Sequence, residues 1–198
     1  MNLKEYRVVF AATALVLILL GASPLLNIFL SFPNKATPFS ELYVLGKDHS
    51  MSEYPLAVTN DTDYRIILGI GNHMHEPSYY RVDVKFRNQT QSPPDSSNLT
   101  PSSLPPLYEY RAFVGDEHTW ETTLVFKLQD ITSDRNSNVV GNISINGETF
   151  TVNSLAAWDS QNGGFYYQIF FELWLYNATS NRFEYNNRAV WIWLNVNP

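Results

Sequence analysis

From residue 41 onward, the chain consists of short segments rich in β-branched and aromatic residues, separated by turn-forming residues. Such segments predict β-strands rather than helices. The ten expected strands are 41–45, 54–58, 64–70, 79–87, 107–114, 119–128, 139–145, 149–152, 165–176 and 189–196. This spacing favours an all-β fold, an antiparallel β-sandwich of immunoglobulin-like type over residues 41–198. One short helical turn is expected within residues 154–160.

Side-chain alternation indicates which face of a strand is buried. In segment 79–87, four apolar side chains alternate with four charged ones, so we expect one face in the core and the other in water. The apolar set is Tyr80, Val82, Val84 and Phe86, and the charged set is Arg81, Asp83, Lys85 and Arg87. Further along, Asn146-Gly147 predicts a tight hairpin turn.

The composition excludes several classes of protein. Of 198 residues, 44% are apolar and only 16% are charged, so the chain can bury a core and is not globally disordered. The absence of cysteine excludes a disulfide framework, an iron–sulfur cluster and thiol catalysis. A net charge of −6 argues against a general nucleic-acid binder.

The N-terminal region predicts a membrane anchor. Residues 8–34 carry no charge, and residues 8–30 are long and apolar enough for a transmembrane helix. Lys4 and Arg7 place residues 1–7 in the cytoplasm and the C-terminal domain outside the cell membrane. Residues 31–40 then form a tether. A signal peptide cleaved after residues 21–23 is the alternative, and it also exports the rest of the chain.

Five Asn-x-Ser/Thr sequences agree with an exported domain. They begin at Asn60, Asn88, Asn98, Asn142 and Asn177, and all follow the predicted span. About three would arise by chance at this composition, so they are candidate glycosylation sites that support the topology only weakly.

Residues 89–106 do not fit a compact core, because five prolines lie among many Ser, Asn and Thr residues. Long loops of this kind are uncommon and tend to be functional or disordered. We expect a surface excursion, and the alternative is a loop that binds a partner.

The sequence Asn72-His73-Met74-His75-Glu76 is the best candidate for a metal site. On a strand, His73 and His75 would share a face, and soft Met74 would suit copper. A site needs three or four ligands, which His49, Met51 or His118 could supply only if the fold brings them close. The favoured interpretation is a polar hairpin connection. Residues 115–118 also predict a polar turn, and no catalytic motif is present, so we expect neither catalysis nor a cofactor.

The C-terminal region is the most informative about function. Strands 165–176 and 189–196 are expected to pair as a hairpin across residues 177–187, with one aliphatic face in the core. The opposite face gathers Phe170, Glu172, Trp174, Tyr176, Trp191 and Trp193. Aromatics beside polar groups stack on sugar rings or form protein interfaces. The alternative is that the long loop or another strand covers them, or that both faces are buried.

Several stretches resemble an archaeal membrane-protein family, the one numbered 1616 among domains of unknown function. They are residues 39–46, Tyr54-Pro55, residues 69–73, Trp120-Glu121 and residues 188–193. Asn187 and Trp191 depart from the family pattern, which has Tyr and His there. The resemblance implies an envelope protein with an outward-facing β domain, and it favours a structural role for His73.

Together these features predict a non-enzymatic interaction or scaffold module of the cell envelope. It would contact membrane lipid through the N-terminal helix and an envelope protein or glycan through its β domain. The first alternative is an accessory subunit of a membrane complex, a transporter or an enzyme. The second is a metal-binding envelope protein that uses His73 and His75.

Overall fold

The structure, a computed structural model, describes residues 6–7, 10–18 and 37–196. The chain divides into two compact units, residues 1–37 and 38–198. In the first unit, residues 6–7 and 10–18 are helical. Within the described segments, no helix has the length and apolar character needed to cross a membrane. Residues 8–9 and 19–30 of the predicted span, and residues 31–36 of the predicted tether, lie outside the described residues.

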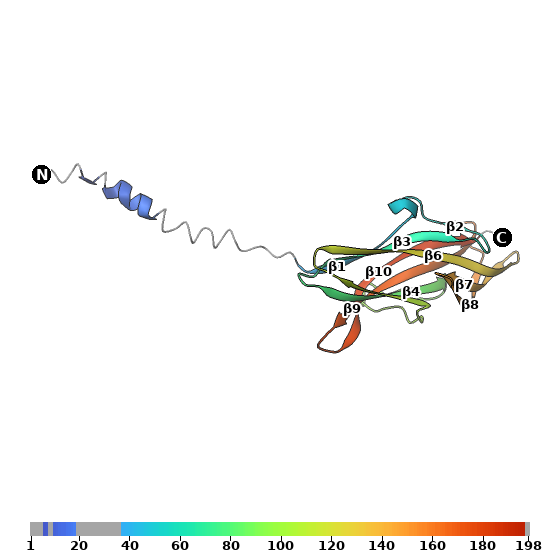
Figure 1. Ribbon diagram of the computed structural model, residues 1–198. Helices are drawn as coiled ribbons and strands as arrows, with labels where there is room; N and C mark the ends of the chain where they lie inside the picture. Colours follow the sequence, from blue (N-terminus) through green and yellow to red (C-terminus); the bar gives the residue numbers. More distant parts are fainter. Residues whose placement is uncertain (1–5, 8–9, 19–36, 197–198) are drawn as a thin grey trace. The chain divides into compact units, whose positions relative to one another are not determined.

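The second unit is built from two five-stranded sheets (Figure 1). The first sheet has the order β1 (Phe39–Leu45), β3 (Tyr64–His73), β6 (His118–Ser133), β7 (Ser137–Ile145) and β8 (Glu148–Ala157). The second has the order β2 (Ala57–Val58), β10 (Arg182–Val196), β9 (Phe165–Asn177), β4 (Ser78–Asn88) and β5 (Tyr108–Val114). A short 3-10 helix, η1 (Lys47–His49), follows β1. All ten predicted strands are therefore present, and the all-β prediction is confirmed.

Three local predictions need correction. The helical turn predicted within residues 154–160 is wrong, because Ser154 to Ala157 belong to β8 and the turn comes only at Asp159–Gly164. Strand β2 has only two residues, and it pairs parallel to β10 rather than antiparallel. The β9–β10 hairpin is longer than predicted, since its pairs begin at Arg182 with Asn177.

The topology only partly matches an immunoglobulin domain. The order β10-β9-β4-β5 reproduces the G-F-C-C′ order of a variable-type sheet. In the first sheet of such a domain, the strand beside B comes after its outer neighbour in the chain. Here β6 lies beside β3 and precedes both β7 and β8, so the immunoglobulin-like prediction does not hold for this sheet.

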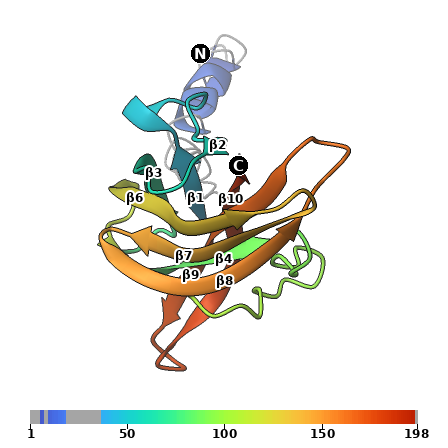
Figure 2. The ribbon, with the colours of Figure 1, turned by 90° about the vertical axis from the view of Figure 1, so that its right-hand side faces the viewer.

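The core lies between the inward faces of the two sheets (Figure 2). Alternation places Ile66 and Leu124 of the first sheet opposite Val82 and Leu194 of the second, and none of these four side chains is exposed. Tyr167 joins the layers, because its buried hydroxyl donates a hydrogen bond to the carbonyl of Asn138 at 2.8 Å. Burial raises the pKa of Tyr167 to about 12.

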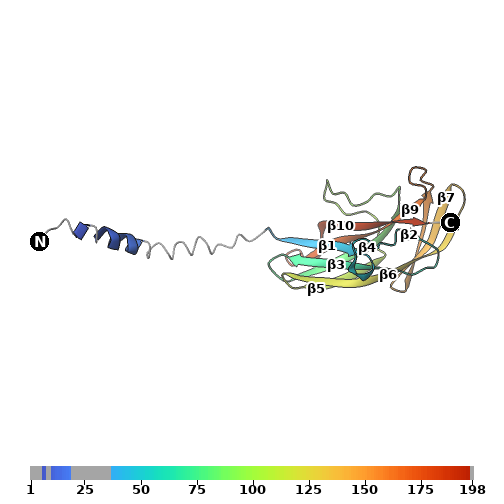
Figure 3. The ribbon, with the colours of Figure 1, turned by 90° about the horizontal axis from the view of Figure 1, so that it is seen from above.

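Strand β4 differs from its prediction, since both of its faces are buried over residues 82–87, while Arg81 is partly buried. Asp83, Lys85 and Arg87 on the outer face are as inaccessible as the apolar residues between them. The reason is residues 89–106, the covering segment, which contacts the outer side of the second sheet (Figure 3). A regular pattern of charges therefore does not guarantee contact with water when a long loop follows the strand.

Candidate functional site

The covering segment is fixed to the second sheet by a buried ion pair. Lys85 Nζ lies 2.8 Å from Glu172 Oε2, and the two side chains are 3% and 0% exposed. The backbone N–H of Ser102 donates to Glu172 Oε1 at 2.6 Å, while Lys85 Nζ donates to the Ser102 carbonyl at 2.9 Å. Both charges are thus satisfied within the protein, which is a condition for burying them.

The predicted aromatic face is consequently divided. Phe170 and Glu172 lie fully buried under the covering segment, so including them in an exposed interaction surface was wrong. Strand register explains why, because Phe170 pairs with Lys85, and Glu172 pairs with Asp83, in the covered middle of the sheet. The long loop is the cover that the alternative interpretation required.

Trp174 and Tyr176 occupy an intermediate position near the tip of the β9–β10 hairpin. Both are half-buried. The Arg81 guanidinium lies 4.6 Å from the centre of the Trp174 ring, and the Tyr176 ring lies 5.4 Å from that of Phe183. Part of each ring is therefore used in packing within the protein.

Trp191 and Trp193 of β10 form the open part of the face. They are 52% and 37% exposed, although the residue between them, Ile192, is buried in the core. Three hollows lie beside them. One, of about 390 Å³, includes Trp193 in its wall, and another, of about 190 Å³, lies between Trp191 and the covering segment. The third, of about 420 Å³, is lined by both tryptophans together with residues of β1. Among the six predicted surface residues, these two remain available to a partner.

The structure does not place His73 and His75 on one strand face. Strand β3 ends at His73, and His75 lies in the following turn with a φ of 63°. His73 Nδ1 lies 2.8 Å from Glu117 Oε2, and its ring stacks on Phe39 with centres 4.6 Å apart. The hydrogen bond with Glu117 raises the pKa of His73.

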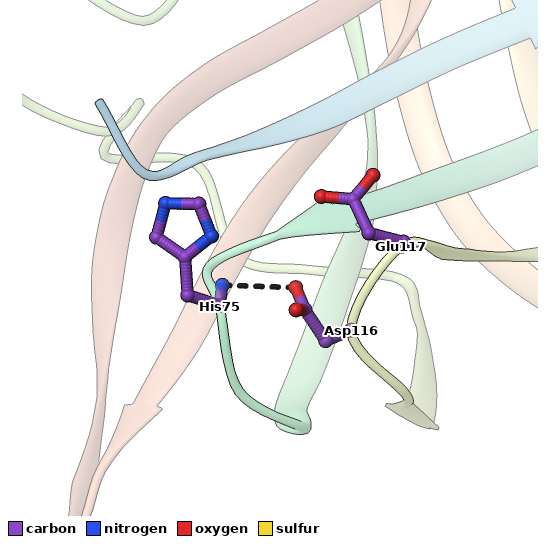
Figure 4. Close-up of side chains that lie close together, drawn as sticks. All are labelled: His75, Asp116 and Glu117. Carbon is purple, nitrogen blue, oxygen red and sulfur yellow. Dashed lines mark hydrogen bonds between the residues drawn. The ribbon is translucent and has the colours of Figure 1, made fainter. Parts of the chain in front are cut away.

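Sequence reasoning missed the partners of His75. The side chains of Asp116 and Glu117 lie beside it, and one ligand atom from each of the three residues falls within 4.8 Å of the others (Figure 4). The Asp116 carboxylate also accepts a 2.9 Å hydrogen bond from the His75 backbone N–H. One imidazole and two carboxylates form a donor set that suits a divalent cation. The other suggested ligands have different surroundings. His49 Nε2 lies 3.1 Å from Glu121 Oε2, His118 Nδ1 lies 2.7 Å from the Asp116 carbonyl oxygen, and the Met51 side chain is exposed.

Buried Asn72 holds the two turns of this cluster together. Its side-chain amide donates to the carbonyls of Val114 and Gly115 at 2.9 and 3.1 Å, and also to that of Glu76 at 2.9 Å. The backbone carbonyl of Asn72 accepts a hydrogen bond from the backbone N–H of Glu117 at 2.8 Å. The polar turn predicted at residues 115–118 is present. One signal could have predicted the cluster of His75, Asp116 and Glu117: the β3–β4 and β5–β6 turns both connect the first sheet with the second at the same end of the sandwich.

The five glycosylation candidates differ in accessibility. Asn60 and Asn98 are exposed in turns, whereas Asn88, Asn142 and Asn177 are half-buried. Each of these three donates a hydrogen bond from its side-chain amide, to the Leu155 carbonyl, Asp130 and Glu184 respectively. A sugar on any of the three would have to be attached to a nitrogen that already contacts the fold.

Fold and surface together define an all-β protein whose second unit is a two-sheet domain with a partly open aromatic face. The model of the family described as a domain of unknown function (DUF1616) matches residues 33–139, which is more than half of the chain. The chain belongs to this family. The match ends at the start of β7, so the resemblance noted at residues 188–193 lies outside it.

Other comparisons add little. A search of the curated proteins finds no match. Among solved structures, the β-glucosidase from Listeria innocua in complex with gluconolactone is 8% identical with a TM-score of 0.35. A mutant of that enzyme in complex with laminaribiose is 7% identical with a TM-score of 0.38. The match covers 80% and 81% of this chain but only 16% of either enzyme, and scores this low carry no inference about function.

Proposed function

We propose that the protein is a non-enzymatic interaction module of the cell envelope, anchored in the membrane by residues 8–30 with its β domain outside. The uncharged run from residue 8 to residue 34 supports the anchor, and the positive residues before it support the orientation. The family match supports only membership of the family and assigns no activity.

Exposure of Trp191 and Trp193 is the observation that carries the proposal. Large aromatics are enriched in the buried centres of interfaces, where they bring much contact area at little entropic cost. Here two of them project from one strand beside hollows, while neighbouring aromatic and charged groups of the same sheet are covered. The surface left open is therefore suited to contact a partner.

Co-purification from native membranes tests this function. We expect a double variant, Trp191→Ala with Trp193→Ala, to lose the partners that the unaltered full chain retains. Phe113→Ala is the matched control, because Phe113 is 71% exposed but lies on edge strand β5, away from β10. Equal recovery of partners by the double variant and the control would refute a role for the open aromatic face.

An accessory subunit of a membrane complex is the first alternative, and the apolar N-terminal run is the feature that favours it. In that case the contacts are made by the anchor itself, where Thr13, Gly21 and Ala22 are small enough for close helix packing. Scrambling residues 8–30 while keeping their composition would then remove every partner, whereas the double tryptophan variant would keep them all.

Metal binding is the second alternative, favoured by the cluster of His75, Asp116 and Glu117. Elemental analysis of the purified full chain, compared with Glu117→Gln, tests it. A bound divalent metal that is lost in the variant would support this alternative, and equal metal content would exclude the cluster as the site.

A further inference from the structure

The hollow beside Trp193 brings together polar and aromatic groups from four segments. Its walls are Gln89 of the covering segment, Asp159 and Asn162 of the β8–β9 turn, Tyr166 of β9 and Trp193 of β10. These residues are up to 104 positions apart in sequence, so only the folded sandwich assembles them. A volume of about 390 Å³ lies in the size range of small-molecule sites.

Trp193 is held as a fixed platform. It pairs with Gln168 on β9, which in turn pairs with Arg87 on β4. The buried Arg87 guanidinium lies 5.1 Å from the centre of the Trp193 ring, within cation–π range. Arg87 Nε also donates to Gln168 Oε1 at 2.5 Å, which fixes the guanidinium in place. The indole therefore keeps its orientation while 37% of the residue stays exposed.

The polar groups of the hollow are also preorganised. Asp159 Oδ1 accepts hydrogen bonds from the backbone N–H groups of Gln161 and Asn162 at 2.9 and 3.0 Å. Asn162 Nδ2 donates to Asp159 Oδ2 at 2.8 Å, and the Tyr166 hydroxyl donates to the Asn162 carbonyl at 2.9 Å. The hydrogen bonds from Asn162 lower the pKa of Asp159, so the carboxylate is an acceptor at neutral pH.

From this geometry we propose that the hollow binds a pyranose ring of a neutral oligosaccharide. The apolar face of a sugar ring stacks on a fixed indole, and its hydroxyls exchange hydrogen bonds with planar carboxylate and amide groups. Asp159 is the charged member of the lining, so a neutral sugar fits better than a sulfated or uronic one. This inference rests on the proposed function and names the partner class for the same surface.

Trp191 extends the site along the strand. It lies two residues from Trp193 on the same face, a rise of about 7 Å. The smaller hollow beside it is lined by Leu99 of the covering segment and Ala189 of β10, among others. A second sugar unit on Trp191 would therefore follow the first along β10, and oligosaccharides should bind more tightly than monosaccharides.

Titration calorimetry on the detergent-solubilised full chain tests the inference, with neutral hexasaccharides of glucose, mannose and N-acetylglucosamine as probes. We expect at least one to bind, with Trp193→Ala weakening binding about tenfold or more and Asn162→Ala weakening it less. Phe113→Ala should bind normally. Unfolding curves identify any variant that fails to fold, and Tyr166→Phe then serves as the milder substitution, because it removes only the hydroxyl that fixes the Asn162 carbonyl.

Two results would overturn the sugar site. The first is that none of the neutral probes binds, or that binding is unchanged by Trp193→Ala. The second is that only sulfated or uronic sugars bind. In either case, continued Trp191- and Trp193-dependent co-purification of a protein would leave the interaction function intact and identify its partner as a polypeptide. Loss of both readouts would remove the function together with the sugar site.

Discussion

The outer face of the second sheet has two regions, one on β4 and the middle of β9 and the other on β10. In both, the sequence alternates core residues with residues predicted to face outward. On β4 and the middle of β9, polar and aromatic residues lie under the covering segment, and the charges pair with one another. On β10, Trp191 and Trp193 stay open to solvent. Polarity alone would predict the reverse arrangement, with the charges outside and the aromatics buried. The difference shows that loop placement, rather than residue type, decides which region can meet a partner.

Breaking the buried ion pair of Lys85 and Glu172 should have the largest effect, because it destabilises the covered region of the sheet. Glu172→Ala leaves the Lys85 ammonium buried without its partner, so we expect the free energy of unfolding to fall by about 3–5 kcal/mol. Denaturant titration of the full chain measures the loss. The double variant Glu172→Met with Lys85→Met removes both charges and should recover most of it. A loss below about 1 kcal/mol in the single variant would show that water reaches the pair.

Substitutions at two neighbouring positions of β10 compare how much its inner and outer faces contribute to stability. Leu194→Ala opens a cavity in the core and should cost about 2–5 kcal/mol of stability. Trp193→Ala removes a larger side chain, but one that is 37% exposed and packs partly on the Arg87 guanidinium, so a smaller loss of about 1–2 kcal/mol is expected. Thermal or denaturant unfolding measures both. Similar costs at the two positions would mean that Trp193 is part of the core rather than of an open surface.

Attachment of the covering segment can be measured at a single amide. The Ser102 N–H bonded to Glu172 should exchange with solvent only when the segment opens. Glu172→Gln combined with Lys85→Met keeps a neutral acceptor without leaving a buried ammonium unpaired, so it should weaken this bond by about 1 kcal/mol and speed exchange roughly fivefold. Hydrogen–deuterium exchange followed by NMR gives both rates. Rapid exchange of this amide in the unaltered protein would contradict a fixed cover.

The exposed pair of His73 and Glu117 should show the smallest effect. Because the pKa of His73 is raised above its ordinary value of 6.5, the fold favours the protonated ring. Its contribution to stability is therefore complete below about pH 6.5 and is lost as the pH rises through the raised pKa. Glu117→Gln should lower the pKa of His73 in an NMR titration of the imidazole Cε1–H signal. An unchanged pKa would show that the pair is absent in solution.

Much of the fold could be predicted from residue patterns. Period-two alternation and turn residues located all ten strands, and the inward faces of β9 and β10 were assigned correctly because both repeat apolar residues at every second position. The helical turn over residues 154–160 was wrong because residue type does not follow burial there: Ser154 and Ala156 of β8 face inward, while apolar Leu155 faces outward.

The site was harder to predict, since it depends on contacts between distant segments. Nothing local to Lys85 or Glu172 shows that the backbone of Ser102 will bond to both of them. The partners of His75 were also hidden, because the β3–β4 and β5–β6 turns meet only after both sheets form. Alternation therefore predicted which side of a strand a residue occupies, and could not predict what covers that side.

The positions of Phe39 and Val196 have a mechanical consequence. Phe39 pairs with His73 at one end of the sandwich, while Val196 pairs with Phe165 at the other (Figure 1). A force applied between these two residues would run along β1 and β10 and load their hydrogen bonds in shear. Because the bonds of a sheared strand share the load rather than breaking one by one, we expect the domain to resist tension applied between these two residues.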